Sequence, residues 1–506
     1  MTKQKIDIKN IVFLTILLLI IFCGCILRIY IWYYHTDFHY DEVCLINNII
    51  NRNYFELFGP LDYAQCSPPI FLILGKLIYS NFGVNERAIC SINFSAGILS
   101  LFLFPFLTFK IFKNKFPILL ANLLFATSFP LLMCSMFYKQ YASDVTFSII
   151  LLLTALFIKD KQLSKLQMFF LSLFCIFCVF CSYTAGFLIF LYVLFLIFKS
   201  FKEKTIKQNL KPFLIFIIPF ASVMIWYFFT NCLATINDDI LQSYWDYKEG
   251  DTFFYPGSYT QIEKVVLYPI RYSYEQNLIN LYYLFIIFIA ATVAVLWKKN
   301  KEKLYFLFSP FVLAFVLGAF HLYPFSAERV SLYLFPFFFL IIFISIDEIP
   351  FEKYKKYIYK YAIVSLCILF FFLYLSNLLN FYIKTFENYD FSAFRFWHNG
   401  KVLPEILNGS DIKENDYLIG YENDAAILYD KKNIINKNKQ YSTGYFFENE
   451  IHLQKHNNFF IWAPINDPPT EKIINWLKSN NCKIIYQIDS YYGKLTKCEL
   501  MSDLKK

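Results

Sequence analysis

The feature that most constrains this chain is a series of long apolar runs that recurs through most of its length. Eleven runs of roughly 16–23 residues are each close to the length of an α-helix that crosses the hydrocarbon core of a bilayer. With 58% of its residues hydrophobic and 21% aromatic, the sequence predicts an α-helical polytopic membrane protein with about eleven transmembrane helices, and it excludes a soluble enzyme. The predicted spans cover residues 11–33, 88–109, 117–136, 143–158, 166–182, 184–199, 212–231, 278–297, 304–320, 330–346 and 361–383.

Lysine clusters divide the loops between these runs into two alternating sets. Loops such as 110–115, 199–211 and 298–303 are rich in lysine, whereas the intervening loops hold few basic residues. Lysine-rich loops stay in the cytoplasm, so we expect the N-terminus inside and the alternate loops outside a bacterial inner membrane. The alternation requires that residues 70–82 do not cross, and their Pro-Pro start and internal Lys76 favour a re-entrant or interfacial helix. The net charge of +9 therefore reports topology and does not indicate nucleic-acid binding.

The composition becomes polar after the last apolar run. Short alternating or apolar runs, among them residues 417–421 and 483–486, surround a helix-like segment, a pattern typical of a small α/β domain. We therefore divide the chain into a transmembrane domain, residues 1–385, and an extracytoplasmic α/β domain, residues 386–506.

Acidic and basic side chains gather in three loops that we expect on the outer face. Asp41 and Glu42 follow the first run and begin an amphipathic helix that is too short to span the membrane. Asp144 lies at the mouth of a later run, and Arg329 ends the loop 321–329. An ionisable side chain at such a boundary is costly unless it is hydrated, paired or functional.

Each of these groups also has a structural interpretation that stays open. The acidic pair would serve equally well as a helix cap with a solvated neighbour. Arg329 could extend its charge to the membrane surface or pair with Glu328. His35 and His39 beside Asp41 imitate a metal cluster, but interfacial histidines more often serve as hydrogen-bonding residues, so we predict no metal site.

The thirteen cysteines do not form a metal-binding signature. Cys175, Cys178 and Cys181 lie in an apolar run, where cysteine is usually a small packing residue. Cys482 and Cys498 flank predicted neighbouring strands of the outer domain and could form a disulfide in an oxidising compartment.

Taken together, these motifs resemble the GT-C membrane glycosyltransferases that use polyprenyl-phosphate sugars, such as the protein O-mannosyltransferases and the lipid A aminoarabinose transferases. The resemblance covers the membrane part from end to end. The aminoarabinose transferases have Lys-Pro where this chain has Ser67-Pro68, which leaves the acceptor open. The motifs are Tyr40-Asp41-Glu42, Ser67-Pro68-Pro69-Ile70-Phe71, Phe82-Gly83 through Arg87, Lys139-Gln140-Tyr141-Ala142-Ser143-Asp144, and Tyr323-Pro324-Phe325 with Arg329.

The resemblance implies transfer of a sugar from an undecaprenyl- or dolichyl-type phosphate to a hydroxyl of a protein, lipid or glycan, with inversion at the anomeric carbon. Asp41 would deprotonate the acceptor hydroxyl, with Glu42 beside it and Asp144 in support. Positive side chains would stabilise the leaving phosphate without a metal ion, and no cofactor is expected besides the lipid-linked donor. The expected substrate-binding residues are Arg329, Lys139, Tyr141, Arg87, Tyr323, Trp245 and Asp246.

Two other functions stay open. A flippase or transporter of lipid-linked sugars would hold its essential charges in the middle of its spans, whereas here nearly all of them stand at span ends. An O-antigen ligase or polymerase would also be polytopic with arginine-bearing outer loops. Such a protein would not be expected to carry an acidic pair directly after its first span.

Overall fold

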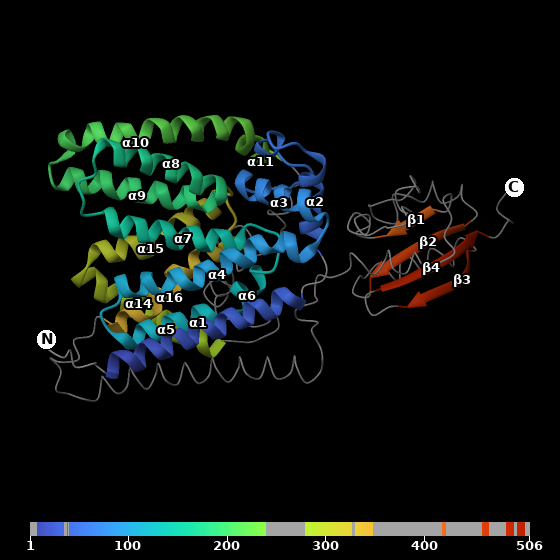
Figure 1. Cartoon of the computed structure of the whole chain (residues 1–506), viewed down its shortest axis with the longest axis horizontal. Coiled ribbons are helices and arrows are strands. Elements are labelled where there is room, and N and C mark those ends of the chain that lie inside the picture. The colour runs from blue at the N-terminus through green and yellow to red at the C-terminus, as the bar shows by residue number, and fades with distance from the viewer. Residues whose placement is uncertain are drawn as a thin grey trace. The chain divides into compact units, whose positions relative to one another are not determined.

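A computed structural model of the chain contains two compact units (Figure 1). The first comprises Met1–His35 and Asn48–Ala393, and the second comprises Thr36–Asn47 and Phe394–Lys506. The residues that the structure describes are 8–34, 38, 40–238, 279–325, 329–347, 417–420, 458–464, 482–489 and 493–500.

The described part of the first unit is helical. Helix α2 (Tyr40–Asn51) crosses the boundary between the units. The other helices are α1 (Ile8–Tyr34), α3 (Pro69–Phe82), α4 (Glu86–Ile111), α5 (Lys115–Thr127), α6 (Phe129–Cys134), α7 (Tyr141–Ile158), α8 (Lys165–Cys181), α9 (Tyr183–Lys202), α10 (Ile206–Tyr227), α11 (Leu233–Ile236), α14 (Ile279–Lys299), α15 (Lys301–Ala319) and α16 (Phe335–Asp347). Short helical turns are the 3₁₀ turn η1 (Glu56–Phe58), the π-helical turn η2 (Phe228–Cys232) and the 3₁₀ helix η4 (Arg329–Leu334).

Six helical segments in the described residues are long and apolar enough to cross a membrane. The mostly helical, multi-pass architecture is therefore confirmed, whereas the count of eleven spans stays a prediction. Helix α3 has 14 residues, or about 21 Å at 1.5 Å per residue, which is shorter than the hydrocarbon core of a bilayer. The six segments are Ile8–Tyr33, Glu86–Ile111, Tyr141–Ile158, Tyr183–Lys202, Leu210–Ile236 and Lys301–Ala319.

The predicted span 117–136 was wrong as a single helix, because the chain breaks at Ser128 between α5 and α6. Pro130 lies in the first turn of α6, where its ring and missing N–H prevent continuation of the preceding helix. The break leaves carbonyl groups at the end of α5 without helical partners. Arg28 of α1, only 1% exposed, donates a hydrogen bond to one of them, the carbonyl oxygen of Ala126, at 3.1 Å.

The helices of the first unit run side by side (Figure 1). Helix α10 packs on α8, α4 packs on α7, and α1 packs on both α4 and α5. Small residues allow close contacts, since a Cβ on Gly24 of α1 would lie 3.0 Å from the Cβ of Ala126 on α5. Aromatic rings fill the wider gaps, as where Phe104 stacks on Phe125 with 4.2 Å between ring centroids.

The described part of the second unit includes a four-stranded sheet, with order β1-β2-β4-β3. Strands β1 (Tyr417–Gly420) and β2 (Asn458–Pro464) are parallel, and β4 (Gly493–Leu500) is antiparallel to both β2 and β3 (Cys482–Asp489). The predicted helix of this domain lies outside the described residues, so the α/β class and the boundary at residue 386 stay predictions.

The register of this sheet bears on the two cysteines of the outer domain. Cys498 lies opposite Ile484, and Cys482 lies opposite Leu500, so the two cysteines are diagonal neighbours rather than a facing pair. Diagonal positions in antiparallel strands are about 7–8 Å apart, beyond the usual Cα separation of disulfides. The disulfide between them stays a prediction.

Candidate functional site

The site is organised around the loop that precedes α7. Asn93 of α4 is fully buried, and its Nδ2 donates hydrogen bonds to the carbonyl oxygens of Phe137 and Lys139. Between these two residues, Tyr138 stacks on Phe71 of α3 with 4.9 Å between ring centroids. The loop is thus held by α4 on its backbone and by α3 on its aromatic side chain.

The side chains of this loop bind the segment that leads into α3. Lys139 is buried and donates from Nζ to the Oε1 of Gln65. Gln140 donates to the carbonyl oxygen of Cys66 at 3.2 Å and accepts from the hydroxyl of Ser67 at 3.3 Å. Two motifs that are separated in the sequence, one beginning at Ser67 and one at Lys139, therefore form a single polar layer.

Asp144 lies in the first turn of α7 and is 3% exposed. Its Oδ1 accepts a hydrogen bond from the hydroxyl of Ser182 at 2.5 Å, and that hydroxyl lies 3.0 Å from the hydroxyl oxygen of Thr184. The first turn of a helix also favours a negative charge, because its backbone N–H groups point outward there. The carboxylate is thereby fixed against the junction of α8 and α9.

A pair of tyrosines extends this layer to α10. Tyr183 donates from its hydroxyl to the carbonyl oxygen of Ser67 at 2.8 Å, and its oxygen lies 2.6 Å from that of Tyr227. Tyr227 precedes the π-helical turn η2, and Asn231 within this turn donates to the carbonyl oxygen of Gly59 at 2.7 Å. The segment from Gly59 to Ser67 is consequently held at both of its ends.

Arg329 begins η4, which packs against α7. Its guanidinium carbon lies 5.8 Å from the ring centroid of Tyr141, a cation–π distance. Tyr323 donates from its hydroxyl to the carbonyl oxygen of Val330 at 3.2 Å. Burial raises the pKa of Tyr323 well above its ordinary value, and the nearby Asp144 carboxylate adds to that rise. The structure therefore gathers Tyr141, Asp144, Tyr323 and Arg329 around the start of α7.

Cys66 is a cysteine of this layer. Burial raises the pKa of its thiol to about 12, against the lowering influence of Lys139. A thiol at such a pKa stays protonated at neutral pH, so this cysteine is not suited to act as a nucleophile.

The other residues predicted from the sequence lie on other elements or outside the described residues. Arg87 is exposed and stacks on Tyr33 of α1 at 4.6 Å, while its carbonyl oxygen accepts from Trp32. Asp41 and Glu42 lie in the first turn of α2, in the second unit; Glu42 is buried and Asp41 is half-buried. Trp245 and Asp246 lie outside the described residues.

Several polar residues of this layer were not singled out from the sequence, among them Asn93, Ser182, Tyr183 and Asn231. Each lies inside or at the end of an apolar helix, where an unpaired polar group is costly, and that position was the available signal. Within the described ranges, no group of three or more His, Cys, Asp or Glu side chains could hold a metal ion. The metal dependence of the protein stays a prediction.

No family model matches the sequence, and no curated protein matches it significantly. Solved structures do share its fold. The chain is similar to the crystal structure of ArnT from Cupriavidus metallidurans bound to undecaprenyl phosphate, with a TM-score of 0.51 and 8% sequence identity over 96% of this chain and 97% of that chain. The apo structure of the same protein aligns with a TM-score of 0.48 at 9% identity, over 94% of this chain and 97% of that chain.

The comparison confirms the resemblance drawn from the short motifs, at the level of the fold. An identity of 8% does not show which residues carry the chemistry.

Proposed function

We propose that this protein is a glycosyltransferase that moves a sugar from a polyprenyl-phosphate donor to an acceptor hydroxyl on the outer face of the membrane. The observation that carries the proposal is the gathering of Lys139, Asp144 and Arg329 around the start of α7 in a fold like that of ArnT, whose structure contains undecaprenyl phosphate. These groups stand at helix ends, where a lipid phosphate and a water-soluble sugar meet.

The donor phosphate is assigned to Arg329. Its guanidinium lies beside Tyr141 at the end of a membrane helix, and a guanidinium can bind two phosphate oxygens through parallel N–H groups. Negative charge on the phosphate grows as the sugar–oxygen bond breaks, so this contact strengthens in the transition state. Lys139, held by Gln65 in the same layer, adds positive charge nearby.

The carboxylates are assigned to the acceptor and the sugar. Asp41 acts as the general base that takes the proton of the acceptor hydroxyl, and Glu42 beside it supports this role. Asp144, oriented by Ser182, accepts hydrogen bonds from sugar hydroxyls. A single displacement by the acceptor oxygen inverts the anomeric carbon and releases polyprenyl phosphate.

The proposal is tested with the purified full-length protein in proteoliposomes that contain an undecaprenyl-phosphate sugar. Release of undecaprenyl phosphate together with glycosylation of an added acceptor supports the proposal. Mass spectrometry of surface glycans and glycoproteins in a deletion strain identifies the acceptor to add. Movement of the intact lipid-linked sugar across the bilayer without its cleavage would instead indicate a flippase.

A further inference from the structure

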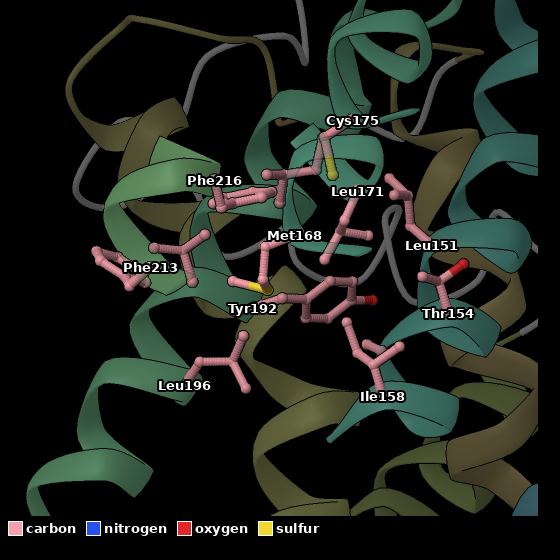
Figure 2. Close-up of a pocket in the computed structure, with 13 residues that line it drawn as sticks. Leu151, Thr154, Ile158, Met168, Leu171, Cys175, Tyr192, Leu196, Phe213 and Phe216 are labelled. Atoms are coloured by element: carbon pink, nitrogen blue, oxygen red, sulfur yellow. The ribbon is translucent and has the colours of Figure 1, made fainter. Parts of the chain in front are cut away.

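The helices of the site also enclose a cavity further along their length (Figure 2). Mostly apolar side chains of α7, α8, α9 and α10 line it, among them Met168 and Phe216. Its volume is about 50 Å³, whereas ligand pockets usually measure about 300–1,000 Å³. On α7 its lining begins at Leu151, seven residues beyond Asp144. The cavity is therefore too small for a sugar or an acyl chain, and it is separate from the polar layer at the start of α7.

In that polar layer, the side chain of Gln65 has contacts at both ends of its amide. Its Oε1 accepts a hydrogen bond from the Nζ of Lys139, and its Nε2 donates to the carbonyl oxygen of Tyr63 at 3.2 Å. Because a carbonyl oxygen can only accept hydrogen bonds, the second contact fixes which end of the amide faces the lysine. The amide of Gln65 therefore presents its oxygen, and not its nitrogen, to the ammonium group.

A backbone turn places the carbonyl group of Tyr63 next to this amide. Tyr63 and Ala64 have φ angles of 63° and 50°, in the left-handed region that residues with a Cβ rarely adopt. Two such residues in succession are costly, and they persist only where the surrounding contacts hold the chain in place. Strained backbone of this kind is concentrated at catalytic and ligand-binding sites. The turn thus points to a functional constraint on Gln65, the residue that follows it.

Contacts on both sides hold this turn. Before it, the buried side chain of Asn48 accepts a hydrogen bond from the backbone N–H of Asp62 at 2.9 Å and donates one to the carbonyl oxygen of the same residue at 3.2 Å. After it, the carbonyl oxygen of Ser67 accepts a hydrogen bond from Tyr183 at 2.8 Å. The turn has little freedom to relax, so the direction of the Gln65 amide is fixed before a ligand binds.

The bond to Gln65 holds Lys139 without neutralising it. An amide oxygen is an uncharged acceptor, and it takes one of the three N–H donors of an ammonium group. Lys139 is only 6% exposed, and its charge reaches the thiol of Cys66, whose pKa it lowers against the larger effect of burial. A glutamate at position 65 would have the same length as the glutamine but would cancel this charge.

We propose that Gln65 is a positioning residue for Lys139, held by the strained turn so that the ammonium group keeps its direction and its positive charge for the phosphate of the donor. The proposal rests on the proposed function, since it takes that phosphate as the ligand of Lys139. Gln65 itself does not touch the substrate. Its effect on phosphate binding therefore depends on the presence of Lys139, and a double-mutant cycle measures this dependence.

The test measures binding of undecaprenyl phosphate to the purified full-length protein by native mass spectrometry. A hydrogen bond to a charged group is worth about tenfold or more in affinity, so we expect Gln65→Met to weaken binding about tenfold. In the Lys139→Met background the same change should weaken binding less than about twofold, because the group through which Gln65 acts is already gone.

Gln65→Glu distinguishes positioning from simple attachment of the segment. Glutamate keeps the length of the side chain and can bind the ammonium group more strongly than an amide does. If Gln65 only attached its segment to Lys139, this variant would bind undecaprenyl phosphate as the wild type does. We expect it instead to bind more weakly than Gln65→Met, because the carboxylate cancels the charge of Lys139.

Gln167→Met is the matched control. The Oε1 of Gln167 accepts a hydrogen bond from the backbone N–H of Ser164 in the capping box of α8, so its loss should lower the thermal unfolding temperature. It should leave the affinity for undecaprenyl phosphate unchanged. Thermal unfolding of every variant in detergent shows whether a loss of binding follows from a loss of fold.

An affinity that is unchanged in Gln65→Met, or lowered equally with and without Lys139, would overturn the proposal, and so would wild-type binding by Gln65→Glu. A wild-type protein that binds undecaprenyl phosphate but transfers no sugar would contradict the proposed function alone, because the cycle still decides the role of Gln65. A wild-type protein that does not bind undecaprenyl phosphate would overturn the role of Gln65, whatever its transfer activity.

Discussion

Arg329 is the residue whose position most directly supports a phosphate site. It begins a 3₁₀ helix that leads directly into the apolar helix α16, and its guanidinium lies over Tyr141. We expect Arg329→Lys to keep only part of the transfer activity, because lysine lacks the planar fork, and Arg329→Ala to keep almost none. The loss should appear in both KM for the donor and kcat, measured in vitro with a purified polyprenyl-phosphate sugar.

Arg87→Ala is the comparison for this prediction. Arg87 is exposed and stacks on Tyr33, so its loss should have the smaller effect. Unchanged donor dependence in Arg329→Ala, with a large loss in Arg87→Ala or in a Lys139 variant, would move the phosphate site to that residue.

The carboxylates give a second prediction at the residue scale. Asp41→Asn should abolish transfer while the protein stays folded, since it keeps the shape of the side chain and removes the base; general bases contribute roughly 10²–10⁴-fold in rate. Asp144→Asn should also reduce the rate substantially, and Glu42→Gln less. Ser182→Ala, which removes the hydroxyl that orients Asp144, should have a smaller effect than Asp144→Asn. Rates are measured at saturating donor. Near-wild-type transfer by Asp41→Asn would indicate that the acidic pair serves only as a helix cap.

At the scale of elements, the loop before α7 depends on helix α3. A Cβ added at Gly75 would collide with the ring of Tyr138, which follows Phe137 and precedes Lys139. Tyr138 is fully buried and stacked on Phe71, so it has little room to move. We expect Gly75→Ala to lower stability by about 1–3 kcal/mol, the usual cost of overpacking, and to reduce transfer because Lys139 is displaced.

Gly186→Ala on α9 is the matched control for this change. A Cβ there would meet the side chain of Val179 at 3.9 Å, an ordinary van der Waals contact. This variant should therefore keep its thermal unfolding temperature in detergent and its activity. A Gly75→Ala protein that melts and transfers like Gly186→Ala would show that the loop does not rely on this contact.

The helices also show which structural features could be predicted from the sequence and which could not. The predicted spans 88–109 and 184–199 agree with α4 and α9 within a few residues. A long apolar run in a bilayer satisfies its own backbone hydrogen bonds by forming a helix. The break at Ser128 was missed, since proline in the first turn of a helix resembles proline inside a longer one.

Only some residues of the site could be predicted from the sequence. Lys139, Tyr141, Asp144, Tyr323 and Arg329 stood out as polar or aromatic residues at span ends, and the structure brings them together. The partners Asn93 and Tyr183 could not be found from spacing. Their bonds to Lys139 and Ser67 join segments 46 and 116 residues apart.

At the scale of the whole molecule, the polar site and the lysine clusters lie at opposite ends of the same helices of the first unit. Asp144, Tyr183 and Arg329 stand at the ends of helices whose opposite ends lead to Lys159, Lys199 and Asp347. Such a division is expected when one end of a helical bundle binds sugars and the positive charge of the other end keeps it in the cytoplasm.

The last prediction is the orientation that follows from this division. Lysine-rich loops resist transfer across the membrane, so residues 110–115, 199–211 and 298–303 should be cytoplasmic, while Asp144, Arg329 and the outer domain should face the other side. Reporter fusions at Lys207 and Lys299 should report the cytoplasm, because two spans separate them, and a fusion at Asn436 should report the outside. Alkaline phosphatase is active only outside and green fluorescent protein fluoresces when folded inside, so paired fusions at each position control for expression. The same compartment for Lys207 and Asn436 would overturn the orientation, and with it the outer-face location of sugar transfer.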